Sequence, residues 1–154
     1  MTAPRFAYEH DILVKVAERL LAERKERWNA AVTAGTITRE KADEGIRITS
    51  AVVQQWRAVV DRADVPDWCS TWAAFGAGES EMRATLDAAQ LRAAKIADAT
   101  PGNRDKADHA DALAALAWHQ RRASPGTQTP AILLFHAVHQ KIRAEIAAER
   151  SKAA

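Results

Sequence analysis

The sequence predicts an all-α protein, a helical bundle of about five helices in a single domain over residues 1–154. Alanine, the best intrinsic helix former, supplies 35 of the 154 residues. In several segments apolar residues recur at alternating steps of three and four, which places them on one face of a helix. No segment shows the alternation of β-branched residues between turns that is typical of a strand. We therefore expect a helical hairpin over residues 11–63, followed by a helical subdomain over 64–150.

The hairpin is predicted from two segments, 11–34 and 38–63, with matching apolar stripes. Between them, Gly35 can adopt a left-handed backbone just past a helix end, and Thr38 can cap the next helix. When the segments fold back around Gly35, the position numbers of facing residues add up to a nearly constant value. The stripes that face each other consist of Val14, Ala17, Leu21, Arg24, Trp28 and Ala31 in the first arm, and Ala42, Ile46, Thr49, Val53, Trp56 and Val60 in the second.

One layer of this predicted seam is polar, because Arg24 faces Thr49. A buried arginine must reach water along its stem or find a hydrogen-bond acceptor, since an unpaired buried charge is costly. We expect Arg24 to extend to solvent at the edge of the two-helix face. A functional anion site is the alternative.

A spaced pattern within the hairpin resembles a known group of proteins. Its members are, in order, Arg24, Trp28, Val32, Gly35, Ile37, Thr38, Glu40, Ala42 and Ile46. The pattern resembles a helical hairpin common among small uncharacterised proteins encoded by phages and prophages of Proteobacteria. That group has no established activity, so the resemblance implies no site residues. It implies a phage or prophage accessory protein, in the host cytosol or as a component of a virion.

A short aromatic helix is predicted over residues 66–75, with proline in its first turn. Trp68, Trp72 and Phe75 follow at helical spacing and share one face. They can close the open end of the bundle, which we favour, or form a surface for a partner.

Two further helices are predicted over residues 80–98 and 104–122, separated by a break around Pro101 and Gly102. Trp118 is expected on a flank of the second. The inward stripes are Met82, Leu86, Ala89, Ala93 and Ile96 in the first helix, and Ala110, Leu113, Leu116 and Ala117 in the second.

The last predicted helix, 130–150, begins apolar on nearly every side. Thr129 is the expected cap and Pro130 the first helical residue. Leu133 and Leu134 belong to this apolar start, and the later stripe runs through His139, Ile142 and Ile146. An element of this kind is normally central to a bundle or shared with another subunit.

Charge is unevenly distributed along a chain of net charge +2. Residues 64–120 carry nine acidic and five basic side chains, whereas residues 121–154 carry two acidic and six basic ones. These regions can neutralise each other within one molecule or between subunits. If Arg121, Arg122, Lys141 and Arg143 converge, they could instead contact DNA phosphates, which makes a DNA-binding accessory protein of phage replication, recombination or packaging the alternative function.

Motifs of catalysis are scarce. The sequence has no phosphate-binding glycine loop, no nucleophile elbow and no paired cysteines with zinc spacing. Asp105, Asp108 and Asp111 could hold a divalent cation in a metal-dependent phosphohydrolase, but acidic residues early in a helix also suit its dipole. His136 and His139 have a spacing that could serve metal ligation, but we interpret them as packing residues, with His139 donating to a backbone carbonyl or a side-chain oxygen. We predict no catalytic residue and no cofactor.

The sequence points to a cytoplasmic protein, since its N-terminus lacks the apolar core of a signal peptide and no apolar run reaches membrane-spanning length. We predict a non-enzymatic accessory protein of phage or prophage type. It would act as a protein–protein interaction module that self-associates or docks on a host or phage protein. The residues expected to bind the partner are Trp68, Trp72, Phe75, Leu133 and Leu134.

Overall fold

A computed structural model of the chain describes residues 2–65 and 70–154 and is all-helical over them. Apart from one isolated β-bridge between Arg122 and Pro130, the described part contains no strand. The all-α prediction is therefore confirmed, whereas Trp68 and the start of the predicted aromatic helix lie outside the described residues. The helices are α1 (His10–Thr33), α2 (Arg39–Val60), α3 (Thr71–Phe75), α4 (Glu79–Ala99), α5 (Arg104–Gln120) and α6 (Ala131–Ala153).

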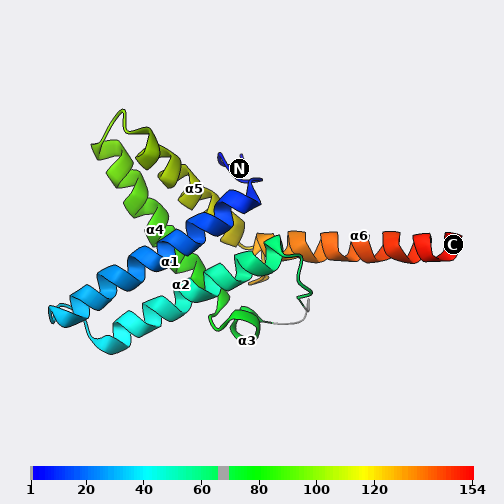
Figure 1. Cartoon of the computed structure of the whole chain (residues 1–154), viewed down its shortest axis with the longest axis horizontal. Helices are drawn as coiled ribbons and strands as arrows, with labels where there is room; N and C mark the ends of the chain where they lie inside the picture. The colour runs from blue at the N-terminus through cyan, green and yellow to red at the C-terminus, as the bar shows by residue number, and fades with distance from the viewer. Residues whose placement is uncertain (1, 66–69) are drawn as a thin grey trace.

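Two helical hairpins form the body of the molecule (Figure 1). Helices α1 and α2 lie side by side and antiparallel, α4 and α5 do the same, and the two hairpins meet near the middle of α1. The short α3 lies beside α2. Helix α6 leaves this body and projects away from it.

The turn between α1 and α2 follows the local chemistry of its residues. Gly35 has a φ of +77°, a left-handed conformation that glycine adopts at little cost. Thr38 precedes α2 in an extended conformation, and its side chain accepts a hydrogen bond from the Lys41 amide at 3.2 Å. Helix α1 can therefore end and α2 begin within a few residues, which lets the two helices run back along each other.

The face of α1 that the fold buries differs by one residue from the predicted stripe. The most buried apolar residues of α1 are Leu13, Ala17 and Leu20, whereas Val14 and Leu21 are only half-buried. Helix α1 packs against α5 as well as α2. The buried face of α1 is consequently turned toward the space between α2 and α5. The prediction matched the apolar stripe of α1 with that of α2 alone and did not include α5.

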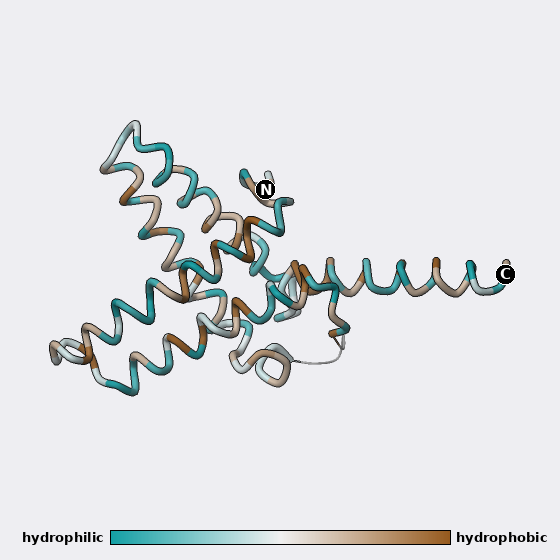
Figure 2. Tube along the Cα trace, viewed as in Figure 1, coloured by the Kyte–Doolittle hydropathy of each residue, from teal (hydrophilic) through white to brown (hydrophobic). Residues whose placement is uncertain are grey.

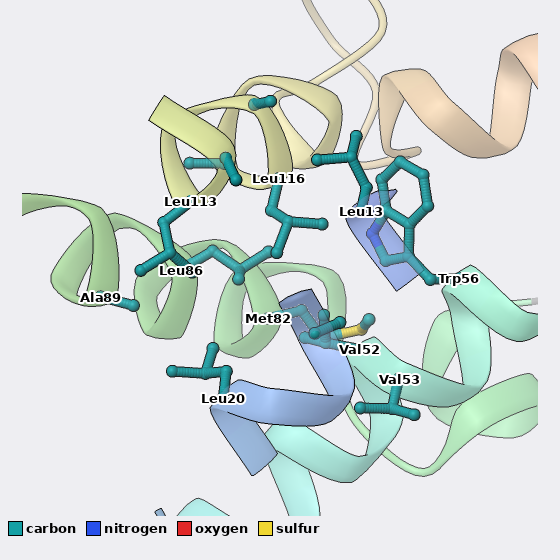
Figure 3. Close-up of a cluster of buried hydrophobic side chains, with 14 of the residues drawn as sticks. Leu13, Leu20, Val52, Val53, Trp56, Met82, Leu86, Ala89, Leu113 and Leu116 are labelled. Atoms are coloured by element: carbon teal, nitrogen blue, oxygen red, sulfur yellow. The ribbon is translucent and has the colours of Figure 1, made fainter. Parts of the chain in front are cut away.

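The apolar core lies where the two hairpins meet (Figure 3). Trp56 is fully buried there and supplies the largest side chain. In α4 the predicted inward stripe ends early, because Ile96 is 42% exposed. Side chains from α1, α2, α4 and α5 converge in this core, joined by Ile132 of α6; the larger ones include Leu13, Leu20, Val52, Val53, Trp56, Met82, Leu86, Leu113 and Leu116.

At the connection between α5 and α6, the end of α5 and the start of α6 each differ slightly from the prediction. Helix α5 ends at Gln120 rather than at residue 122, because the next residues enter a backbone pairing with the start of α6. The Ala131 amide donates to the Arg121 carbonyl at 2.8 Å, and the Ala123 amide donates to the Thr129 carbonyl at 2.9 Å. Pro130 becomes the residue that precedes α6, not its first helical residue.

Only the start of α6 is attached to the body. Ile132 is buried in the core, and the His136 ring donates from Nε2 to the Ala63 carbonyl at 2.7 Å. Beyond these first turns the helix extends freely to its end (Figure 1). Among the described residues, no helix is both long enough and apolar enough to cross a membrane.

Candidate functional site

The projecting part of α6 carries a ridge of large aliphatic side chains. Leu134, Val138, Ile142 and Ile146 are each four residues apart, a spacing that forms one continuous ridge along a helix. Each is between 46% and 48% exposed. Apolar positions recur along the projecting helix in Figure 2. We call these four residues the α6 ridge.

The α6 ridge lies on the side of the helix opposite its attachment to the body. Ile132, His136 and Gln140 are also four apart, and they face the body. Gln140 accepts a hydrogen bond from the Val65 amide at 3.5 Å. Positions two residues apart are about 200° apart around a helix, so the two sets lie back to back. The fold thus uses one face of α6 and leaves Val138, Ile142 and Ile146 facing solvent, while the half-exposed Leu134 lies at the edge of the body.

This orientation corrects the prediction for the two histidines of α6. His136, not His139, is the buried ring that bonds to a backbone carbonyl. His139 is exposed, and its ring lies 4.2 Å from that of Phe135. The predicted stripe through His139 pointed Ile142 and Ile146 inward, but both are exposed. The error arose because the sequence does not show which face of α6 meets α2 and α5.

The predicted partner-binding residues are divided between core and surface. Trp72 is 55% exposed, with the Arg47 guanidinium 4.7 Å from the centre of its ring. Phe75 and Leu133 pack against the core, and Leu134 belongs to the exposed ridge. Of these four described residues, therefore, only Trp72 and Leu134 remain exposed enough to act as contact residues. Trp68 lies outside the described residues.

Charges on α6 are not neutralised by the rest of the molecule. Within the described ranges, no charged side chain of α6 forms an ion pair at 4.0 Å or less. Lys141, Arg143 and Glu145 lie on the two flanks of the α6 ridge. The basic C-terminal region thus stays separate from the acidic middle of its own chain.

The structure does not gather the four candidate DNA-binding residues into one cluster. The Arg121 guanidinium stacks 3.6 Å from the centre of the Trp118 ring and donates to the Trp118 carbonyl at 2.6 Å. Arg122 is exposed in the loop at the base of α6. Lys141 and Arg143 lie on the projecting helix, about 15 Å or more beyond its first residue.

Two of the three candidate metal-binding aspartates form ion pairs with an arginine. The Arg5 guanidinium lies 2.5 Å from Asp108 and 3.4 Å from Asp111, while Asp105 lines a separate pocket. Across residues 2–65 and 70–154, no group of three or more His, Cys, Asp or Glu side chains is arranged to hold a metal ion. The arrangement of Asp108 and Asp111 is that of a surface ion-pair cluster joining the N-terminus to α5.

Comparison of the chain with models of protein families, with curated proteins and with solved structures finds no match in any of the three. The resemblance of the hairpin to phage and prophage proteins therefore stays a prediction.

Three of the four ridge residues were missed as binding residues by sequence reasoning. Leu134 was among the predicted partner-binding residues, Ile142 and Ile146 were predicted to point inward, and Val138 was assigned to neither set. A usable signal was present, because their regular spacing of four continues well beyond the apolar start of the helix. That spacing indicates an apolar face of the helix, but it does not indicate which helix or partner packs against that face.

Proposed function

We propose that the protein is a non-enzymatic helical interaction module that self-associates through the α6 ridge. The observation that carries this proposal is a helix of 23 residues that is attached at its start and then exposes four large aliphatic side chains in a row. Exposed apolar patches that are flanked by charges are typical of protein-binding surfaces. The ridge has that composition, with Lys141, Arg143 and Glu145 beside it.

A second copy of the chain suits this surface for a geometric reason. Ridges formed by residues four apart pack into the matching grooves of another helix at a crossing angle of about −50°. A ridge can meet an identical ridge across a two-fold axis, so the same surface serves both partners. The unpaired basic charges of α6 and the acidic middle region of a second copy add charge complementarity between subunits.

The size of the ridge predicts a weak complex. Burial of a fully exposed aliphatic side chain contributes about 1.5–3 kcal/mol, so half-exposed side chains contribute roughly 1 kcal/mol each. Eight of them in a symmetric pair give roughly 8 kcal/mol, against a cost of association of at least about 4 kcal/mol. A net gain of about 4 kcal/mol corresponds to a dissociation constant of about 1 mM, so we expect a weak dimer that becomes detectable only at the highest concentrations.

Sedimentation equilibrium between about 5 and 500 µM tests the proposal. The wild-type chain should shift from monomer toward dimer across this range, and Ile142→Asp should remain monomeric because a carboxylate cannot be buried in an apolar contact. The matched control is Ile96→Asp on α4, which changes the same residue type at 42% exposure compared with 46% for Ile142. The control should associate as the wild type does.

A monomer at every concentration would contradict self-association. Equal loss of association in both variants would show that the surface involved is not the α6 ridge.

The phage or prophage accessory role belongs to the same proposal and is supported by the resemblance of the hairpin. In the competing DNA-binding role, the wild type would retard DNA at low salt and a variant with Arg121→Ala and Arg122→Ala would not.

A further inference from the structure

A second feature, separate from α6, is a pocket between α1 and the α4–α5 hairpin. Its volume is about 550 Å³, within the range of small-molecule sites. Its lining comes from the middle of α1, the second half of α4 and the first half of α5. The α4–α5 hairpin is seen to run at an angle to α1 in Figure 1. Its charged or titratable lining residues are Arg19, Glu23, Arg24, Arg27, Arg92, Asp105, Lys106 and His109.

Arg24 is the unusual member of this lining, because only 6% of it is exposed and it has no acidic partner among the described residues. Its Nη1 donates to the hydroxyls of Thr49 and Thr85, both at 3.0 Å, and its Nη2 donates to the Thr85 carbonyl at 3.3 Å. Its Nε is buried and has no hydrogen-bond partner in the described part of the chain. Arg24 therefore does not extend to solvent, as the sequence predicted, but is buried against neutral acceptors.

The neighbouring charges leave the pocket basic. Glu23 is paired with Arg19 at 2.7 Å, and Asp105 is the other acidic lining residue. Arg27, Arg92 and Lys106 have no ion-pair partner within the described residues. Five cationic side chains against two carboxylates give the lining a net charge of about +3 with histidine neutral.

Burial disfavours the charged form of Arg24. Burial lowers the pKa of its guanidinium to about 10, with smaller contributions from the positive charges of Arg27 and Arg92. The side chain is still charged at neutral pH. A buried cation that lacks an anion destabilises a fold, so an anion bound in this pocket would compensate the charge.

Two further features of the pocket concern the shape of its ligand. The first turn of α5 contributes Asn103, Asp105 and Lys106, so the positive end of that helix dipole lies at the pocket. Another part of the lining is apolar and includes Leu20, Ile96 and Leu113. A ligand that matches both parts has an anionic group and an apolar or ring-containing group.

We propose that this pocket binds a small organic phosphate of about nucleotide size, with the phosphate near Arg24, Arg27 and Arg92. Guanidinium groups bind phosphate oxygens through paired charge-assisted hydrogen bonds, and several of them together favour a doubly charged anion. The apolar wall then contacts the rest of the ligand. The volume is sufficient for a mononucleotide and far larger than a bare phosphate ion requires.

Calorimetric titration of the full-length chain with two probes, inorganic phosphate and AMP, tests the proposal at constant ionic strength. We expect saturable binding of both, with AMP at least tenfold tighter because only AMP reaches the apolar wall. A double variant with Arg27→Gln and Arg92→Gln should weaken AMP binding at least tenfold. Both arginines are exposed, so the variant should fold, which a thermal melt followed by circular dichroism checks.

The matched control removes two positive charges outside the pocket, with Arg122→Gln and Arg150→Gln at other exposed positions. It should bind AMP as the wild type does. An Arg24→Gln variant should also lose AMP binding. Absence of saturable binding, equal affinity for the two probes, or equal weakening by the control pair would each overturn the proposal.

Discussion

At individual residues, several polar side chains that this fold buries form hydrogen bonds to segments distant in the sequence. The Gln55 amide donates to the Gln120 carbonyl oxygen at 2.8 Å, which joins α2 to α5. His119 approaches the Ala7 carbonyl at 2.5 Å, and His136 approaches that of Ala63. Buried polar groups need such partners, because leaving one unpaired costs about 1–3 kcal/mol. These contacts therefore select one arrangement of helices that the alanine-rich surfaces alone would not specify.

His119 predicts a dependence of stability on pH. Its ring is packed between Trp56 and Trp118, with ring centres 5.2 and 4.9 Å away. Burial lowers its pKa from 6.5 to about 4 in the folded protein, although its bond to Ala7 opposes the shift. The unfolded chain takes up the proton below its ordinary pKa and the folded chain does not. The free energy of unfolding should therefore fall by up to roughly 3 kcal/mol as pH decreases from 6.5 to 4.

Urea unfolding at several pH values measures this dependence, and His119→Gln provides the comparison. Glutamine does not titrate, so the variant should show a shallower decline over the same interval even if its stability at pH 7 is lower. Some decline will persist, because burial also lowers the pKa of His10. An identical decline in both proteins would show that His119 is not the responsible group.

At the scale of single helices, the α1–α2 hairpin depends on a close approach at Gly45. A Cβ atom at this position would lie 2.5 Å from two ring carbons of Trp28. The guanidinium groups of Arg24 and Arg27 lie 5.2 and 5.8 Å from the centre of the Trp28 ring. The absence of a side chain at Gly45 thus allows the indole to pack directly on the backbone of α2.

Gly45→Ala should destabilise the protein by about 1–2 kcal/mol, because the added methyl group displaces the indole. At an unhindered helical position the same change stabilises by about 0.5–1 kcal/mol. Chemical denaturation measures the effect, and a double-mutant cycle with Trp28→Leu isolates the contact. In the Trp28→Leu background, Gly45→Ala should be neutral or stabilising. A destabilisation of the same size there would contradict the steric explanation.

The two ends of helix α6 have different roles. Its first turns contribute Ile132 and His136 to the body, whereas its later turns expose the α6 ridge. In proteins, most of the stability of a helix comes from tertiary packing, and the later turns of α6 have little of it in the monomer. Packing of the ridge against a second copy would supply the missing tertiary contacts, which links the stability of this element to its proposed role.

At the scale of the whole molecule, the projecting end of α6 should be dispensable for folding of the monomer. Every residue from 144 to 154 is exposed. Deletion of residues 144–154 should therefore change the free energy of unfolding of dilute protein by no more than about 0.5 kcal/mol. Because Ile146 is removed, the same deletion should weaken self-association. Thermal denaturation at low concentration, combined with sedimentation, measures both effects, and loss of monomer stability would show that the end of α6 packs on the body.

Much of the architecture was determined by local sequence patterns. Helix-forming composition, apolar spacing and the residues around Gly35 and Thr38 predicted helices at the correct places, because these signals act within a few residues. They did not determine where each apolar face points. For that reason Ile142 and Ile146 were expected inside, and Arg24 was expected at the edge.

The relation between elements distant in the sequence is set by tertiary packing and cannot be read from local patterns. The angle between the hairpins creates the pocket in which Arg27 and Arg92 lie together, and the attachment of α6 through His136 turns its aliphatic ridge to solvent. A helical sequence specifies its own faces, since residues three and four apart are neighbours on its surface. Which neighbour covers each apolar face depends on how all the helices pack together, because the core is too small to bury every apolar face.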